Sequence, residues 1–119
     1  MRSNKLDSSK LAHYLIDVGL DMQAEDVVML DIRKIAVFAD YFIILTSGAD
    51  RHSRALREEM LKRLKSLGVR VGHVEGSAIS GWQLLDFGDV IVHIMGRSDR
   101  EFYKLEELWK DALQVVRIQ

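Results

Sequence analysis

The chain has 119 residues, which is the size of one domain with a core of its own, and its 17 basic and 18 acidic residues leave a formal net charge of -1. It has no cysteine, which excludes disulfides, thiolate catalysis and cysteine-bound zinc. No apolar run approaches the roughly 20 residues of a membrane-spanning helix, and the N-terminus lacks the apolar stretch of a signal peptide. We therefore expect no membrane association and a cytoplasmic location.

The first half of the chain predicts a helix followed by two buried strands. Ser8 or Ser9 can cap a helix that ends near Gly19, with an apolar stripe of Leu11, Ala12, Leu15, Ile16 and Val18. The run 27–32, apolar except at Asp31, and the segment 41–47 are both typical of strands covered on two faces. The segment 34–40 between them predicts an irregular connection.

A second helix is predicted to begin at Asp50 as its cap and to stop at Gly68. Its core stripe is Leu56, Met60, Leu64 and Leu67, spaced four, four and three residues apart. On its polar side, Glu58 with Lys62 and Glu59 with Arg63 are in the favourable order for i,i+4 ion pairs.

The second half predicts three strands and a closing helix. The strands fall at 69–75, 82–87 and 90–95, with Gly88 and Asp89 as a tight turn that joins the last two into a hairpin. The helix is predicted over about 99–112, with Phe102, Leu105, Leu108, Trp109 and Ala112 on one face. We therefore expect an α/β (α+β) fold in one domain over 1–119, with its core in 8–112. Its mixed sheet of about five strands is flanked by helices.

Charge is divided unevenly along the chain. Residues 51–70 hold seven basic and two acidic groups, whereas residues 71–96 hold three acidic groups and no lysine or arginine. In the basic helix, Arg51, Arg54 and Arg57 could contact RNA phosphates. No aromatic residues interleave with these cations, so base stacking is not expected, and a solvated helix face is the commoner outcome for such a pattern.

The segment without bases is the stronger candidate for a binding surface. Because side chains alternate along a strand, Trp82, Leu84 and Asp86 share one face and Gln83, Leu85 and Phe87 share the other. If the Leu85 and Phe87 face is core, the first face presents an aromatic residue, an apolar neighbour and a charge. That composition is typical of a protein interface, and its acidity suits a basic partner. The alternative is that Trp82 only covers the end of the sheet.

The motifs GWQLLDFGDVIVHI and REFYKLEELW, with EDVVMLDIR, ADYFIILTSG and DRHSRAL upstream, together resemble the Iojap-type ribosomal silencing factors. The resemblance implies a non-enzymatic translation regulator that docks on the large ribosomal subunit through its ribosomal protein number fourteen and obstructs joining of the small subunit. It also implies homodimers and a nucleotidyltransferase-like fold, without cofactor, metal or small-molecule substrate. The partner-binding surface that we expect comprises Trp82, Leu84, Asp86, Gly88 and Asp89, with Glu75, Asp40 and Tyr41.

Two enzymatic alternatives have weaker support. A nucleotidyltransferase-like reaction would use Asp31, Asp40 and a magnesium ion, but Ser47 and Gly48 stand in reverse of the Gly-Ser order typical of those enzymes and the paired carboxylate is missing. No two histidines have helical zinc-site spacing. We expect His93 to be a partly buried, hydrogen-bonded histidine.

Overall fold

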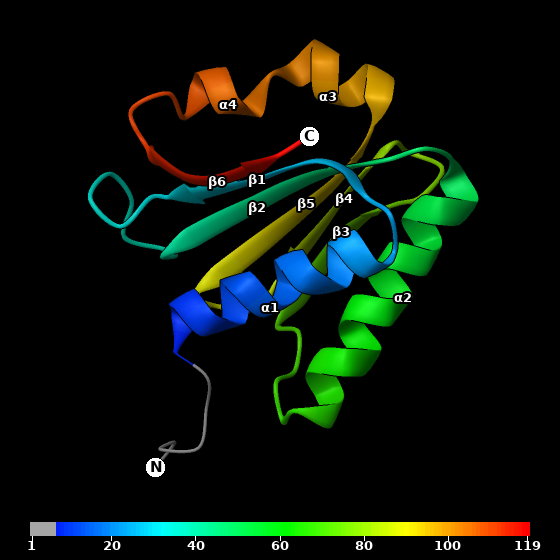
Figure 1. The fold of residues 1–119 in the computed structure, drawn as a ribbon, viewed down its shortest axis with the longest axis horizontal. Helices are drawn as coiled ribbons and strands as arrows, with labels where there is room; N and C mark the ends of the chain where they lie inside the picture. Colours follow the sequence, from blue (N-terminus) through cyan, green and yellow to red (C-terminus); the bar gives the residue numbers. More distant parts are fainter. Residues whose placement is uncertain (1–6) are drawn as a thin grey trace.

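A six-stranded mixed sheet forms the middle layer of this computed structural model, which describes residues 7–119 (Figure 1). The strands are β1 (Glu25–Asp31), β2 (Tyr41–Ser47), β3 (His73–Ser77), β4 (Trp82–Asp86), β5 (Val90–Gly96) and β6 (Leu113–Ile118). They lie in the order β3-β4-β5-β2-β1-β6, with β2 and β5 parallel and every other neighbouring pair antiparallel. The predicted mixed sheet flanked by helices is confirmed, with six strands rather than about five.

Helices cover both faces of the sheet (Figure 1). On one side lie α1 (Ser8–Asp21) and α2 (Asp50–Ser66); on the other lie α3 (Arg97–Tyr103) and the single turn α4 (Leu105–Leu108). The α1 and α2 side packs on alternate residues of the central strands, including Ile43, Leu45 and Val92, and all three are fully buried. The opposite side packs on Phe42, Ile44 and the other alternate positions. This two-sided burial explains why β2 and β5 are mostly apolar along their whole length.

Both helices of the α1 and α2 layer begin differently from the prediction. Asp7, not Ser8 or Ser9, caps α1, because its carboxylate accepts the Lys10 amide at 2.8 Å. The Ser8 hydroxyl instead donates to Asp40 at 2.6 Å. Asp50 is the first residue of α2 rather than its cap, and the cap position is Ala49, with no side-chain hydrogen bond. A carboxylate in the first turn still favours the helix dipole.

The predicted stripe of α2 is confirmed except at its end. Leu56, Met60 and Leu64 are fully buried, whereas Leu67 lies beyond the last helical residue and is 46% exposed. Of the two predicted ion pairs, the structure contains the Arg63 to Glu59 pair, at 2.6 Å. Glu58 lies instead 3.8 Å from Arg57.

The predicted closing helix is wrong in its continuity. Lys104 adopts a left-handed backbone (φ 48°, ψ 57°), which separates α3 from α4. This break rotates the apolar positions out of one stripe: Leu105 is buried, but Phe102 and Leu108 are 77% and 73% exposed. Leu105 and Trp109 pack on the sheet as predicted, and the helix ends at Leu108 rather than Ala112.

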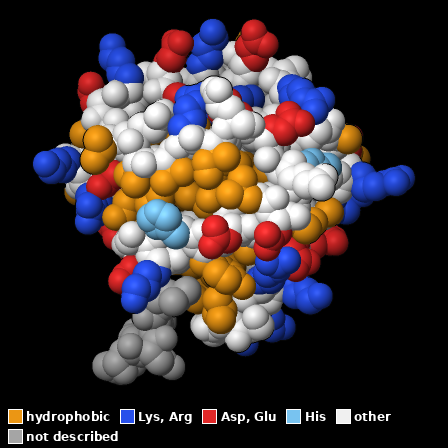
Figure 2. All heavy atoms as spheres, in the orientation of Figure 1, with side chains coloured by type: hydrophobic (Ala, Val, Ile, Leu, Met, Phe, Trp, Pro, Cys, Tyr) orange, Lys and Arg blue, Asp and Glu red, His pale blue; other side chains and the backbone are white. Residues whose placement is uncertain are grey.

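The sixth strand lies beyond the predicted core boundary at residue 112. β6 pairs with β1 and forms one edge of the sheet, with Leu113, Val115 and Ile118 at least 42% exposed. Figure 2 shows apolar side chains gathered on the surface where β6 and β1 run beside α1. The β-branched residues Val115, Val116 and Ile118 were the sequence signal for this strand.

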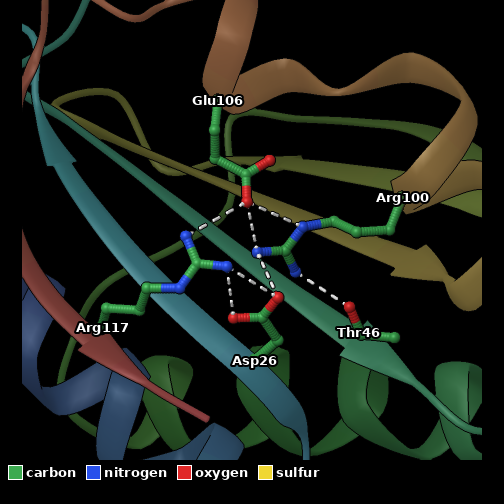
Figure 3. Close-up of polar contacts among 5 residues, drawn as sticks. All are labelled: Asp26, Thr46, Arg100, Glu106 and Arg117. Atoms are coloured by element: carbon green, nitrogen blue, oxygen red, sulfur yellow. Dashed lines mark hydrogen bonds and ion pairs between the residues drawn. The ribbon is translucent and has the colours of Figure 1, made fainter.

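A buried ion network fastens α3, α4 and β6 to the sheet (Figure 3). The Arg100 guanidinium, 8% exposed, donates to Glu106 at 2.7 and 3.1 Å and to the Thr46 hydroxyl at 2.8 Å. Asp26 lies 3.5 Å from Arg100 and 3.0 Å from Arg117 of β6. Burial is the largest single influence on the pKa of Glu106 and would raise it, but the hydrogen bonds from Arg100, a backbone hydrogen bond and the charges of Arg100 and Arg117 together lower that pKa. Five elements, β1, β2, α3, α4 and β6, are thereby joined.

Candidate functional site

The β4–β5 hairpin is the centre of the predicted partner-binding surface, and its turn forms as expected. Gly88 has φ +94°, a conformation that glycine adopts without a steric penalty, and its amide donates to the Asp86 carboxylate at 2.7 Å. Phe87 donates its amide to the Val90 carbonyl at 3.0 Å and closes the loop. Gly88 and Asp89 are exposed at the tip.

The turn also brings in the segment before β2. The carbonyl oxygen of Asp89 accepts the amides of Asp40 and Tyr41, at 2.7 and 3.1 Å. The Asp40 and Asp89 backbones therefore lie side by side although the residues are 49 positions apart. Tyr41 is only 5% exposed, and its ring lies below the Arg33 guanidinium, which is 5.3 Å from the ring centroid. Tyr41 is thus buried in the core on the α1 and α2 side, while Asp40 is partly exposed.

The strand registers place the other predicted residues on one face. Leu84 pairs with Glu75 of β3 on one side and with His93 of β5 on the other, so the three side chains point the same way. Trp82 and Asp86 share that face, and Gln83 and Leu85 are fully buried on the opposite face, as alternation predicted. Helices α3 and α4 leave Trp82 and Leu84 partly exposed.

Trp82 is held in a fixed orientation. Its indole Nε1–H donates to the Nδ1 atom of His93 at 3.1 Å, and its ring lies 4.8 Å from the ring of Tyr103, centroid to centroid. Tyr103 follows Asp99 by four residues in α3, so both face the same side of the helix. The prediction did not include these two residues, because their spacing in the sequence does not show that α3 lies close to Trp82.

His93 is hydrogen-bonded, as predicted, but at 5% exposed it is buried rather than partly buried. Burial lowers the pKa of His93 to about 4. Because the Trp82 indole is a donor only, Nδ1 of His93 must be the acceptor, and protonation of His93 at Nδ1 breaks this hydrogen bond. The orientation of Trp82 therefore depends on a neutral His93.

We expect this histidine to make the protein acid-sensitive. In the unfolded chain the pKa of His93 is near 6.5, whereas in the folded protein it is about 4. The stability that depends on neutral His93 is therefore fully present above pH 6.5 and is lost as the pH falls towards 4. Between pH 7 and 4.5 the free energy of unfolding should fall by about 2 kcal/mol more in the wild type than in His93→Asn, whose amide oxygen replaces Nδ1 as acceptor. Urea unfolding at both pH values measures this difference. Equal losses in the two proteins would show that His93 does not titrate as described.

One of the three α2 arginines that could contact RNA is not on the open surface of the helix. Arg57 is turned towards the sheet and donates to the Gln83 side chain at 2.9 Å, which in turn donates to Ser53. Arg51 and Arg54 are exposed. Two of the three candidate arginines thus remain on the open surface of α2.

The carboxylates of the enzymatic alternative have protein partners. Asp31 accepts the Arg33 guanidinium at 2.7 Å, and this hydrogen bond holds the pKa of Asp31 below its usual range. Asp40 accepts from Ser8. Within residues 7–119, no three histidine or carboxylate side chains gather as a metal site would need, and no helix is long and apolar enough to cross a membrane.

The family described as "Ribosomal silencing factor during starvation" matches residues 5–119. The chain belongs to this family. It is 38% identical over 92 residues to the ribosomal silencing factor of Bacillus subtilis, covering 77% of this chain and 78% of that protein. It is 30% identical over 112 residues to the chloroplastic protein Iojap of Arabidopsis thaliana, covering 92% of this chain and 45% of that protein. The resemblance to Iojap-type factors is confirmed.

Two solved structures have a similar fold. A crystal structure of a Chromobacterium violaceum protein superposes with a TM-score of 0.84 at 30% identity, covering 88% of each chain. A Bacillus halodurans structure superposes with a TM-score of 0.77, also at 30% identity, covering 86% of this chain and 95% of that one. The family names describe ribosome-associated silencing factors rather than enzymes.

Proposed function

We propose that this ribosomal silencing factor docks on the large ribosomal subunit, through its basic ribosomal protein number fourteen, and that its bulk then blocks joining of the small subunit. It would act in the cytoplasm, without cofactor or substrate. The docking surface comprises Trp82, Leu84, Asp86, Gly88, Asp89, Glu75 and Asp40.

The observation that supports this proposal most directly is the gathering of acids from separate segments around the hairpin. Asp40 comes from the loop before β2, Asp86 and Asp89 flank the turn, and Glu75 lies across β4 on β3. No lysine or arginine occurs between residues 71 and 96. The negative potential of such a surface steers a basic protein towards it and repels RNA phosphates.

The docking surface would make charged contacts and apolar contacts with the partner. Asp86 and Asp89 pair with lysine or arginine of the partner, and the partly exposed Trp82 and Leu84 bury apolar area beside them. Tyr41 is buried and would not itself contact the partner. Arg51 and Arg54, on the other side of the sheet, would add at most minor contacts to ribosomal RNA.

Co-sedimentation tests the docking directly. The wild-type protein, mixed with isolated large subunits and with isolated small subunits, should pellet with the large subunits only. Because the proposed contacts are few and apolar area contributes, binding should weaken only modestly with added salt. Failure to pellet with large subunits would refute the proposal, and a steep salt dependence would favour an RNA interface on α2 instead.

Self-association in the free state is the second part of the proposal, and the exposed edge strand β6 supports it. An open edge with apolar side chains can pair with the same edge of a second copy and extend the sheet. We expect Leu113→Lys with Ile118→Lys to raise the dissociation constant of the dimer at least about tenfold. Sedimentation equilibrium measures this constant, and Ile79→Lys, at a 78% exposed loop position, is the matched control. A dimer that persists in the β6 variant would exclude this edge.

A further inference from the structure

Beside Trp82 the surface is hollowed into a cavity of about 350 Å³. The Trp82 and Tyr103 rings form its aromatic wall, with their planes tilted by 49° and their centroids 4.8 Å apart. The remaining apolar lining comes from Leu84, and Glu75 and Asp99 supply two carboxylates. No lysine or arginine of the described chain lines it. This apolar and aromatic cavity therefore has two carboxylates in its lining and, among the described residues, no lysine or arginine to balance them.

The position of Asp99 depends on a specific glycine. Gly81 has φ +86°, and a Cβ atom there would lie 2.5 Å from Oδ2 of Asp99, so only glycine allows the carboxylate to come this close. Among residues 7–119 no hydrogen bond reaches the Asp99 carboxylate. Glu75 has one neighbour, His73, whose Nε2 atom is 2.8 Å away. Asp99 therefore lies at the cavity, and no protein hydrogen bond within residues 7–119 uses its carboxylate.

We propose that this cavity receives one cationic side chain, arginine or lysine, of the basic protein on which the domain docks. The aliphatic stem of that side chain packs on Leu84, its cationic head lies against the Trp82 and Tyr103 rings, and Glu75 and Asp99 accept its N–H groups. A cation over aromatic faces is attracted by their quadrupoles, and the attraction grows when water is displaced. A nucleic acid is disfavoured, because its phosphates would meet two carboxylates.

This inference rests on the docking proposed above and adds two residues to it, Asp99 and Tyr103. It gives Trp82 a second role, as one wall of a recess for a single cation rather than only an apolar contact. The planar guanidinium of arginine stacks on an aromatic ring better than an ammonium does, so arginine is the expected occupant.

The first experiment uses a small probe and follows the indole resonance of Trp82 by NMR. Titration with N-acetyl-arginine methylamide should shift this resonance saturably, whereas the uncharged citrulline analogue should not, and the lysine analogue should bind more weakly. In Asp99→Asn the arginine titration should require at least about fivefold more ligand. Asp50→Asn, outside the cavity, should match the wild type. Equal shifts with arginine and citrulline, or none with either, would overturn the proposal.

The second experiment separates the cavity from the docking as a whole. Glu75→Gln with Asp99→Asn should weaken co-sedimentation with large subunits about tenfold or more, and Tyr103→Leu should weaken it less. If the wild type pellets with large subunits and the Glu75 and Asp99 double variant pellets equally well, the cavity proposal is refuted but the docking proposal stands. A wild type that does not pellet would refute the docking itself.

Discussion

Charge reversal at the hairpin, Asp86→Lys with Asp89→Lys, is expected to weaken binding to isolated large subunits by about 100-fold or more. Each reversal removes an attraction and places a like charge opposite a basic partner, and each such change at an interface contributes on the order of tenfold. Quantitative co-sedimentation over a range of protein concentrations measures the effect.

Two further variants separate charge from geometry in this experiment. Because Asp86 also accepts the Gly88 amide that shapes the turn, Asp86→Asn keeps that acceptor and removes only the charge. We expect it to lose about tenfold. Glu58→Lys reverses a charge on α2, on the other side of the sheet, and should bind as the wild type does. If all three variants bind equally well, the hairpin is not the docking surface.

The largest effect on stability is expected from Arg100→Met. This change leaves the partly buried carboxylates of Glu106 and Asp26 without their central cation, and breaking a buried ion pair from one side typically costs 3–5 kcal/mol. Arg117 remains near both carboxylates, so we expect a loss of about 3 kcal/mol in the free energy of unfolding. Urea denaturation at pH 7 measures it.

Matched variants identify the cause of that loss. Adding Glu106→Gln to Arg100→Met should restore part of the stability, because the most closely paired carboxylate is then neutral. Arg63→Met removes two ion pairs, to Asp21 and Glu59, but the Arg63 side chain is 33% exposed, so the change should cost under about 1 kcal/mol. A loss at Arg100 as small as that at Arg63 would show that the network contributes little to the attachment of α3 and β6.

Elements with strong periodicity could be predicted from the sequence, because local pattern and tertiary burial agree in them. β2 was predicted at its observed bounds, since a strand covered on both faces is an unbroken apolar run. The β4–β5 hairpin and the two faces of β4 were predicted from side-chain alternation and from Gly88. The acidic surface was predicted from composition, strand alternation and the family resemblance, and its binding role stays a prediction.

The errors have tertiary causes. The closing helix breaks at Lys104, where a non-glycine residue adopts a left-handed backbone and Arg100 turns inwards to meet Asp26 on β1. No local signal in the sequence reveals this pairing across 74 residues. Asp99 and Tyr103 were missed for the same reason: their proximity to Trp82 depends on where the break places α3.

The central claim is that docking through the hairpin prevents the subunits from joining. Sedimentation of mixed small and large subunits on a sucrose gradient, with and without the protein, tests it most directly. We predict that the wild type lowers the fraction of joined ribosomes and remains with the free large subunits, and that Asp86→Lys with Asp89→Lys leaves joining unaffected. Normal joining in the presence of bound wild-type protein would contradict the account.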